Sequence, residues 1–347
     1  MDNMIQFLGR QNLSVSEAMQ MIDRNASGII FLVDDENRLL GCITDGDIRR
    51  FLLAGGKMDA PAADAANRHP RAAKTREEAR ALYHKKNYII IPILDESGVV
   101  TDLFAGEAGE ERRVRNPLNM PVVINAGGKG TRLDPYTRVL PKPLIPVGDI
   151  PIIELIMQEF QSYACSAFHI IVNYKKNLMK AYFADSDRDY AISWYDEEKP
   201  LGTGGGLSLL KGKLSSTFFF TNCDSLLTAN YESMVKFHKE NGNMITMICA
   251  YKNLTIPYGV VEMGKNGSIE QMKEKPVISC LTNTGIYIVE PEVLDDLEEE
   301  SIGFPDIIER QKQKGNRVAV YPVSENDWMD MGQISELEKM RVKLYGE

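Results

Sequence analysis

The sequence lacks a membrane-length apolar run and any cluster of histidines. No window approaches the roughly 18 uninterrupted apolar residues that a membrane span needs. The first residues, MDNMIQFLGRQNLSVSEAM, have no basic stretch followed by an apolar one, so we expect no secretory signal. The four histidines are scattered, at positions 69, 84, 169 and 238. That scatter argues against a histidine-based metal site.

Closely spaced cysteines are also missing. The five cysteines are odd in number and contain no C-x-x-C pair: Cys42, Cys165, Cys223, Cys249 and Cys280. A zinc site or a disulfide framework is therefore not expected, and each thiol fits a small buried side chain in a reducing compartment. We predict a cytoplasmic protein.

Positive charge is in deficit. The chain has 49 acidic and 40 basic residues, a formal net charge of −9. Such a balance disfavours nucleic acid and membrane surfaces as partners. The 44% hydrophobic and 26% charged fractions are those of an ordinary soluble globular protein. A length of 347 residues suggests two domains, or three, at roughly 150 residues each.

The first third of the chain contains a degenerate repeat. Residues 17–34 read EAMQMIDRNASGIIFLVD and residues 78–95 read EARALYHKKNYIIIPILD. Each copy predicts a helix, a β-branched strand, an Asp-rich turn and a second strand, at 39–44 and 99–104. Chance similarity between two βα units is the alternative. The shared order, spacing and turn chemistry favour duplication.

The segment GCITDGDIRRFL (41–52) makes this region resemble a tandem pair of cystathionine-β-synthase-type (CBS) domains. The resemblance implies that Thr44 and Asp47 hold a regulatory nucleotide by its ribose. The alternative is that both residues only cap the following helix. The second copy reads LFAGEAGE and lacks this signature, so we expect one nucleotide site or none. CBS pairs often self-associate, which predicts a homo-oligomer. The charged residues 107–119 read as a linker.

The second half opens with a strand that leads directly into a glycine loop. PVVIN (121–125) precedes AGGKGTRLDPYTRVLPKPLIPV (126–147). Glycines at a strand's carboxyl end let a backbone approach phosphates closely, and Lys129, Arg132 and Lys142 add positive charge. The loop is not G-x-x-x-x-G-K-[ST]. It is not G-x-G-x-x-G either, because Leu133 stands at the third glycine position.

The whole segment resembles the signature of sugar-1-phosphate nucleotidyltransferases: A-G-G-x-G-T-R-L, then Pro and Thr, then P-K-P. Further similar segments extend the resemblance over about 120–340: YDEEKPLGTGGGL, FFFTNCDSLL, PYGVVEM, KEKP, TNTGIYIVE and DWMDMG. It implies an α/β fold, a Rossmann-like mixed sheet of the GT-A type, preceded by the tandem CBS pair. We place the domains at 1–115 and 120–347.

The resemblance also assigns roles to residues. The catalytic set is Arg132, Lys142 and Lys275. The nucleotide-binding set is Ala126, Gly127, Gly128, Gly130, Thr131, Gly202 and Thr203. The sugar-phosphate set is Gly259, Glu274, Lys275 and Thr284, and the Mg²⁺ ligands are Asp224 and Asp330. Taken singly, most of these residues have a simpler interpretation as turn residues, a glycine hairpin or a solvated charged loop.

The implied reaction joins a nucleoside triphosphate to a sugar 1-phosphate, giving an NDP-sugar and pyrophosphate. Two polyanions must meet, so cations and Mg²⁺ would neutralise charge. The run EEKPLGTGGGL most resembles guanylyltransferases, which favours GTP. The CBS fusion resembles glucosamine-1-phosphate guanylyltransferases of legionaminic-type acid biosynthesis. The alternatives are thymidylyl-, uridylyl- or cytidylyltransfer to another hexose 1-phosphate, and a non-catalytic nucleotide sensor.

Overall fold

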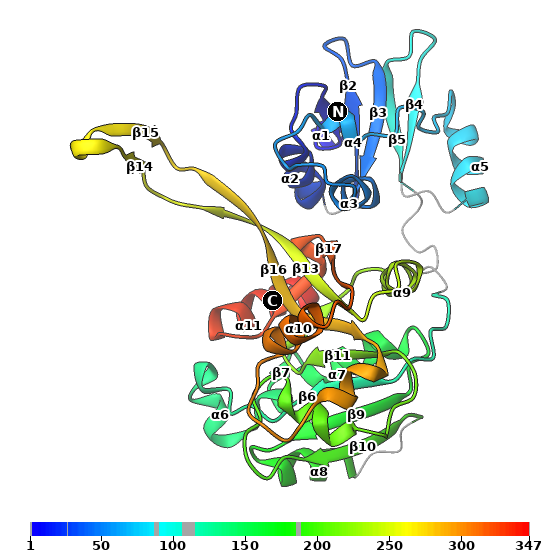
Figure 1. Ribbon diagram of the computed structural model, residues 1–347. Helices are drawn as coiled ribbons and strands as arrows, with labels where there is room; N and C mark the ends of the chain where they lie inside the picture. Colours follow the sequence, from blue (N-terminus) through cyan, green and yellow to red (C-terminus); the bar gives the residue numbers. More distant parts are fainter. Residues whose placement is uncertain (1, 26, 87–89, 106–114, 185–188, 347) are drawn as a thin grey trace. The chain divides into compact units, whose positions relative to one another are not determined.

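The computed structural model describes the chain except for residues 1, 26, 87–89, 106–114, 185–188 and 347 (Figure 1). The chain divides into two compact units. The first consists of Met1–Arg113, Tyr251–Cys280 and Ser324–Asn326. The second consists of Val114–Ala250, Leu281–Val323 and Asp327–Glu347. Residues 107–114 of the predicted linker lie outside the described residues.

The amino-terminal part of the first unit is built from two small sheets with short helices. β1, β2 and β3 form one sheet, in which β1 is parallel and β3 antiparallel to β2. β4 and β5 form an antiparallel pair. The elements are α1 (Asp2–Ile5), β1 (Leu8–Arg10), α2 (Val15–Asn25), β2 (Ile29–Val33), β3 (Leu39–Thr44), α3 (Asp45–Leu53), α4 (Ala62–Ala65), α5 (Arg76–Lys86), β4 (Ile91–Leu94) and β5 (Val100–Phe104).

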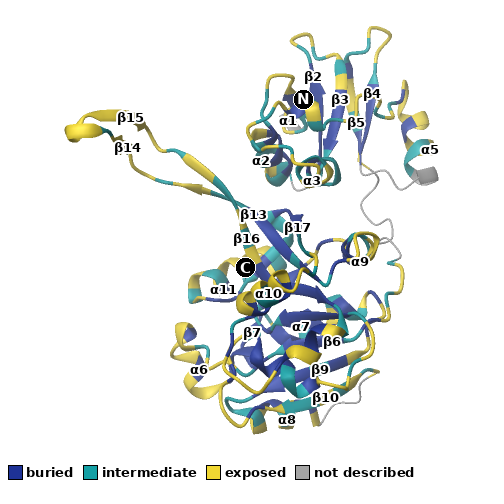
Figure 2. Cartoon of the chain, in the orientation of Figure 1, coloured by how far each residue is buried: buried dark blue, intermediate teal, exposed yellow. Residues whose placement is uncertain are grey.

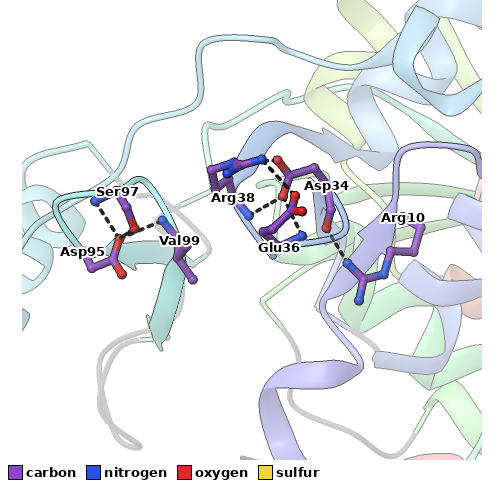
Figure 3. Close-up of polar contacts among 7 residues, drawn as sticks. All are labelled: Arg10, Asp34, Glu36, Arg38, Asp95, Ser97 and Val99. Atoms are coloured by element: carbon purple, nitrogen blue, oxygen red, sulfur yellow. Dashed lines mark hydrogen bonds and ion pairs between the residues drawn. The ribbon is translucent and has the colours of Figure 1, made fainter.

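The turns that close these two strand pairs are built alike (Figure 3). Asp34 Oδ1 accepts from the backbone N–H groups of Glu36 and Arg38, at 3.1 and 2.8 Å. Asp95 Oδ1 accepts from those of Ser97 and Val99, both at 2.9 Å. A carboxylate that satisfies its own turn in this way explains why an aspartate begins both turns.

The strand pairs also share an irregularity at the same place. The register shifts between Leu32 and Val33 in the first pair and between Ile93 and Leu94 in the second. Both shifts lie directly before the aspartate turns. The second copy therefore repeats the backbone path of the first in detail as well as in outline.

A seven-stranded mixed sheet forms the centre of the second unit. Its strand order is β10-β9-β6-β11-β16-β13-β17. The first four strands are mutually parallel, β16 runs antiparallel to β11, and β17 is parallel to β13. The α/β class and the mixed sheet predicted from the sequence are confirmed.

The strands of this unit are β6 (Val122–Asn125), β7 (Pro146–Val147), β8 (Ile150–Pro151), β9 (Ala167–Val172), β10 (Ala191–Asp196), β11 (Phe218–Asn222), β12 (Ser225–Leu227), β13 (Ile245–Thr255), β16 (Val277–Val289), β17 (Val318–Val323) and β18 (Trp328–Asp330). The α-helices are α6 (Tyr136–Val139), α7 (Ile152–Gln161), α8 (Lys176–Ala184), α9 (Tyr231–Glu240), α10 (Phe304–Gln313) and α11 (Ile334–Tyr345).

Both faces of this sheet are covered, as expected for a largely parallel sheet (Figure 2). Along β6, Val122 and Ile124 belong to one hydrophobic cluster and Val123 to the other. Helices α7, α8, α9 and α11 contribute to the first cluster and α10 to the second. Apolar side chains on alternate sides of each strand thus anchor the sheet between two helical layers.

Two strands of the sheet, β13 and β16, continue into a hairpin made of β14 (Val260–Met263) and β15 (Ile269–Lys273) (Figure 1). β14 and β15 pair only with each other among the described strands. Every residue of β15 is exposed. Among the described residues, no helix has the length and apolar character needed to cross a bilayer.

Candidate active site

The glycine loop leaves the sheet at the end of β6, a central strand. Gly127, Gly128 and Gly130 follow it and lead into a short 3₁₀ turn at Thr131–Leu133. Gly130 has a φ of +65°, and a Cβ there would lie 2.9 Å from the Cβ of Lys142. Glycine is therefore required at this position by both its conformation and its close contact with Lys142.

A cavity of about 400 Å³ opens beside this loop. That volume lies in the range of small-molecule sites. Five stretches of the second unit, brought together by the sheet, supply its walls: Asn125–Arg132, Lys142, Glu197–Thr203, Asn222–Asp224 and Gly332. The cavity lies where parallel strands β6 and β11 end, which is the usual ligand position in open α/β sheets.

An acidic pair, Asp224 and Asp330, lies beside the cavity, and Asp224 belongs to its lining. Strands β12 and β18 pair antiparallel and set Ser225 opposite Asp330, and the N–H of Met331 donates to the Asp224 carbonyl at 2.8 Å. Burial, and then the nearby Asp224 charge, raises the pKa of Asp330. Lys142 is buried and its Nζ forms an ion pair with Asp224 Oδ2. The Lys142 ammonium and the Arg132 guanidinium oppose this rise in the pKa of Asp330.

The donors of this acidic pair fit a magnesium ion. Carboxylate oxygens are the ligands that Mg²⁺ prefers, and it commonly takes one or two of them while keeping water and substrate phosphate. Within the described residues, no group of three or more His, Cys, Asp or Glu side chains suits a metal. Asp224 and Asp330 would thus provide a site that a substrate phosphate completes.

A buried carboxylate, Glu197, also lines the cavity. Its side chain is 4% exposed, and its Oε1 has no hydrogen-bond partner. A Cβ on Gly127 would approach its Oε2 to 2.7 Å, so glycine at 127 makes room for this carboxylate. Burial raises the pKa of Glu197 to about 7, while a hydrogen bond from the Leu201 backbone opposes the shift. An unpaired buried acceptor is costly unless a ligand satisfies it.

Comparison with known proteins agrees with this geometry. The family model described as nucleotidyl transferase matches residues 121–345, which contain every segment that lines the cavity. The chain belongs to the nucleotidyl transferase family. A CBS domain model matches residues 10–54, so a CBS domain lies at the amino terminus.

Two curated relatives illustrate the likeness. A UTP–glucose-1-phosphate uridylyltransferase of Synechocystis sp. is 30% identical over 243 residues. A mannose-1-phosphate guanyltransferase of Schizosaccharomyces pombe is 33% identical over 234 residues. Each match covers 62% of this chain and 61% of the relative, so the chain spans about three fifths of the relatives' length.

A solved structure supports the fold of the nucleotidyl transferase domain. The crystal structure of HddC from Yersinia pseudotuberculosis has a TM-score of 0.52 with 19% sequence identity. The likeness covers 65% of this chain and 99% of that one. At this level of identity it speaks for the fold alone.

Most of the predicted nucleotide and catalytic residues meet in the cavity of this nucleotidyl transferase domain. Those that line it are Gly127, Gly128, Gly130, Thr131, Arg132, Lys142, Gly202, Thr203 and Asp224. Ala126 is buried behind the loop, and its N–H donates to the Ile171 carbonyl at 2.8 Å. Asp330 is not among the lining residues but lies close enough to Asp224 to feel its charge.

The predicted sugar-phosphate residues are placed differently. Gly259, Glu274 and Lys275 flank the β14–β15 hairpin, in the first compact unit, and are not among the lining residues of the cavity. A Cβ on Gly259 would lie 3.1 Å from Glu274 Oε2, so these two positions adjoin. Thr284 is buried in β16, and its hydroxyl donates to the Ile248 carbonyl at 2.8 Å. Their roles in sugar binding stay predictions.

Thr44 and Asp47 form a capping box at the start of α3. The Thr44 hydroxyl and backbone N–H both donate to Asp47 Oδ2, at 2.6 and 2.9 Å, and the Asp47 N–H donates back to Thr44 Oγ1 at 3.2 Å. The capping interpretation of this pair is therefore realised in the structure. Its nucleotide role stays a prediction.

The sequence interpretation gave no site role to six lining residues, among them Glu197 and Asn125. Glu197 lies inside the run YDEEKPLGTGGGL that was singled out, but a single acid in a charged run gives no signal of burial. Asn125 ends β6, and its side-chain amide faces the carbonyls of Thr203 and Gly202 at 3.3 and 3.5 Å. It thereby links the two glycine-rich loops that line the cavity.

Proposed function

We propose that this protein is a sugar-1-phosphate nucleotidyltransferase that uses GTP. The observation that carries the reaction class is the cavity at the end of β6, where a glycine loop, Lys142 and the Asp224–Asp330 pair converge. Family membership and the activities named for the relatives support it: uridylyltransfer to glucose 1-phosphate and guanylyltransfer to mannose 1-phosphate.

In the proposed reaction, a phosphate oxygen of the sugar 1-phosphate attacks the α-phosphorus of the triphosphate. A new P–O bond forms as the bond to the β-phosphate oxygen breaks, and pyrophosphate leaves with that electron pair. The nucleophile is already ionised near neutral pH, so no general base is required. The scarcity of histidine is consistent with such a site.

The residues of this chain would act mainly by holding charge in place. Backbone N–H groups of the glycine loop and the Arg132 guanidinium are suited to the β- and γ-phosphates, where negative charge accumulates as pyrophosphate departs. Lys142, which lines the cavity and pairs with Asp224, would contact the transferred phosphate. Lys275 would hold the phosphate of the incoming sugar. Mg²⁺ bound by Asp224 and Asp330 would supply further neutralisation and a bridge between the reactants.

Glu197 supports GTP over the other nucleotides. Guanine presents two adjacent donors, N1–H and the N2 amino group, and a carboxylate accepts from both. Uracil and thymine present one N–H donor between two carbonyl groups, so a carboxylate opposite them would face repulsion. Glu197 lines the cavity, and its Oε1, which lies against Gly206, has no hydrogen-bond partner. A solved structure of HddC complexed with GMP-PN agrees with a guanine nucleotide in this fold.

For the sugar, we propose glucosamine 1-phosphate. Support comes from the order of domains, a CBS region ahead of the transferase, which resembles the enzymes of legionaminic-type acid biosynthesis. We also propose that the sheets closed by the Asp34 and Asp95 turns are a tandem CBS pair within residues 1–115, ahead of a transferase domain at 120–347. A regulatory nucleotide would bind near Thr44 and Asp47.

Two further expectations concern the location of the protein and its oligomeric state. The cysteines at 42, 165, 223, 249 and 280 form no disulfide among the described residues, and we propose a cytoplasmic location. Self-association of the CBS pair would give a homo-oligomer. Light scattering on the full chain, with and without added nucleotides, tests the second expectation.

The deciding experiment is pyrophosphate release with Mg²⁺, using GTP, UTP, dTTP, CTP and ATP against hexose and hexosamine 1-phosphates. We expect release with GTP and glucosamine 1-phosphate, and at least a 100-fold loss in Asp224→Asn. Release with another pair would revise the base or sugar while keeping the reaction. No release, with or without nucleotides for the CBS region, would favour a non-catalytic nucleotide sensor.

A second experiment isolates the base. Glu197→Gln should lower kcat/KM for GTP by roughly 30- to 100-fold, because an amide cannot accept from both guanine donors. The kcat/KM for UTP should fall by a smaller factor or should rise. The KM for GTP of the unaltered protein should fall as the pH rises from 6 to 8, since the pKa of Glu197 is about 7. An unchanged base preference in Glu197→Gln would exclude this residue as the base reader.

A further inference from the structure

The β14–β15 hairpin has one apolar and one polar face. Antiparallel pairing sets Val261 opposite Met272 and Met263 opposite Ile269. Directly opposed residues point to the same side of a sheet, and neighbours along a strand alternate. Val260, Glu262, Gln271 and Lys273 occupy the other side, as the pairs Val260–Lys273 and Glu262–Gln271.

A β-bulge completes the apolar face. The register shifts between Glu262 and Met263, which leaves Glu270 as an extra residue on β15. Without it, Ile269 would share the polar face with Gln271. The extra residue turns Ile269 to the side of Met263, a recognised use of bulges. The β-bulge thus places four apolar side chains on one face of the hairpin.

This apolar face is uncovered. Val261, Met263, Ile269 and Met272 are between 48% and 78% exposed. None of them belongs to a hydrophobic cluster of the described residues. An isolated two-stranded hairpin is at best marginally stable in water, and an amphipathic sheet normally packs its apolar face against another element. Figure 2 shows the hairpin as largely exposed.

We propose that the apolar face of this hairpin packs against the same face of a second copy of this chain. A twofold axis lets one patch serve as its own partner and produces a closed dimer. Residues 254–278 expose eight large apolar side chains. At on the order of 100 Å² each, the four on the apolar face offer about 400 Å² per partner, half of a standard interface, and the other four (Leu254, Tyr258, Val277 and Ile278) lie nearer the root of the arm.

Charge along the hairpin favours an antiparallel pair of arms. The end nearest the tip carries Glu262, Lys265 and Glu270, a net charge of −1. The root carries Lys273, Glu274 and Lys275, a net charge of +1. A twofold axis across the arms sets each tip against the partner's root, so opposite charges meet at the rim.

Sedimentation equilibrium and light scattering on the full chain test the proposal without reference to catalysis. The unaltered protein should have twice the 39.0 kDa chain mass. The double variant Met263→Ser, Ile269→Ser should raise the dimer dissociation constant by at least about 100-fold. Val342→Ser, which alters an exposed valine of α11 outside the arm, should leave the dimer intact. Far-ultraviolet circular dichroism and an unchanged urea-unfolding transition confirm that each variant is folded.

Oxidative cross-linking of two neighbouring positions tests the face itself. Val261→Cys lies on the apolar face and Glu262→Cys on the polar face. We expect disulfide-linked dimers from Val261→Cys only, above the level of the parent chain with its native cysteines. A monomeric parent, a double variant that remains dimeric, or equal cross-linking from both positions would overturn the proposal. A dimer that persists in the double variant would point to the CBS region instead.

Discussion

Replacing Glu197 by glutamine should stabilise the second compact unit, with a gain that grows as the pH rises. Burial raises the pKa of this carboxyl from 4.5 to about 7. Ionising it therefore costs more in the folded than in the unfolded chain, by about 3 kcal/mol when one pKa unit is worth about 1.4 kcal/mol. This cost applies only at pH values at which the Glu197 carboxyl is ionised in the unfolded chain.

The direction in which stability changes with pH follows from the linkage between proton binding and folding. Because the folded-state pKa lies above the unfolded value, the stability of the unaltered protein is highest below about pH 4.5. It falls as the pH rises toward 7 and is level above that value. Glutamine keeps the shape and cannot ionise. The advantage of Glu197→Gln in the free energy of unfolding should thus increase by roughly 2 to 3 kcal/mol between about pH 5 and pH 8.

Urea unfolding followed by tryptophan fluorescence provides the assay. Both tryptophans, Trp194 and Trp328, lie in the second unit and report on it selectively. Glu198→Gln is the matched control, since Glu198 is exposed and its removal should change stability by less than about 0.5 kcal/mol at either pH. An advantage of Glu197→Gln that stays constant or shrinks between pH 5 and pH 8 would refute the reasoning.

Three further predictions concern other sites. Asp330→Asn should lower pyrophosphate release by at least about 100-fold and weaken its Mg²⁺ dependence; normal metal titration in this variant would remove Asp330 from the metal site. Burial raises the pKa of Cys223 to about 12, so iodoacetamide at pH 8 should leave it unmodified until the protein unfolds; mass spectrometry of native and denatured samples checks this, and native labelling would contradict the burial. Thr44→Ala should cost about 1 kcal/mol locally and speed amide exchange in α3 about fivefold; unchanged exchange would mean that the cap contributes little.

The amino-acid sequence was informative where function depends on short contiguous segments. The glycine loop follows β6 in both sequence and space, so Gly127, Gly128 and Gly130 could be expected together at the end of this strand, where they line one cavity. The repeat of α2–β3 in α5–β5 was likewise visible, because turns that begin with Asp34 and Asp95 depend on local hydrogen bonds. Features that are formed by local interactions can be recognised in a short stretch of sequence.

The roles of positions that depend on partners far along the chain were harder to predict from the sequence. Glu197 becomes a buried, unpaired acceptor only because the loop that follows β10 folds against Gly127. The Asp224–Asp330 pair depends on β12 meeting β18, more than one hundred residues later. Burial and charge coupling are properties of the assembled structure, so an acid in a charged run looks like any solvated acid until the fold is known.

The β14–β15 hairpin shows the same difference between what the sequence predicts and what only the fold reveals. Its residues alternate too irregularly for a pattern to assign a face, because the extra residue Glu270 breaks the period of two. The sequence by itself predicted the fold class, the glycine loop that follows β6 and the repeated aspartate turns. The tertiary structure decided which carboxylates are buried and which apolar side chains share a face. Those properties arise from register and packing between segments distant in the chain, and register is set only when the strands pair.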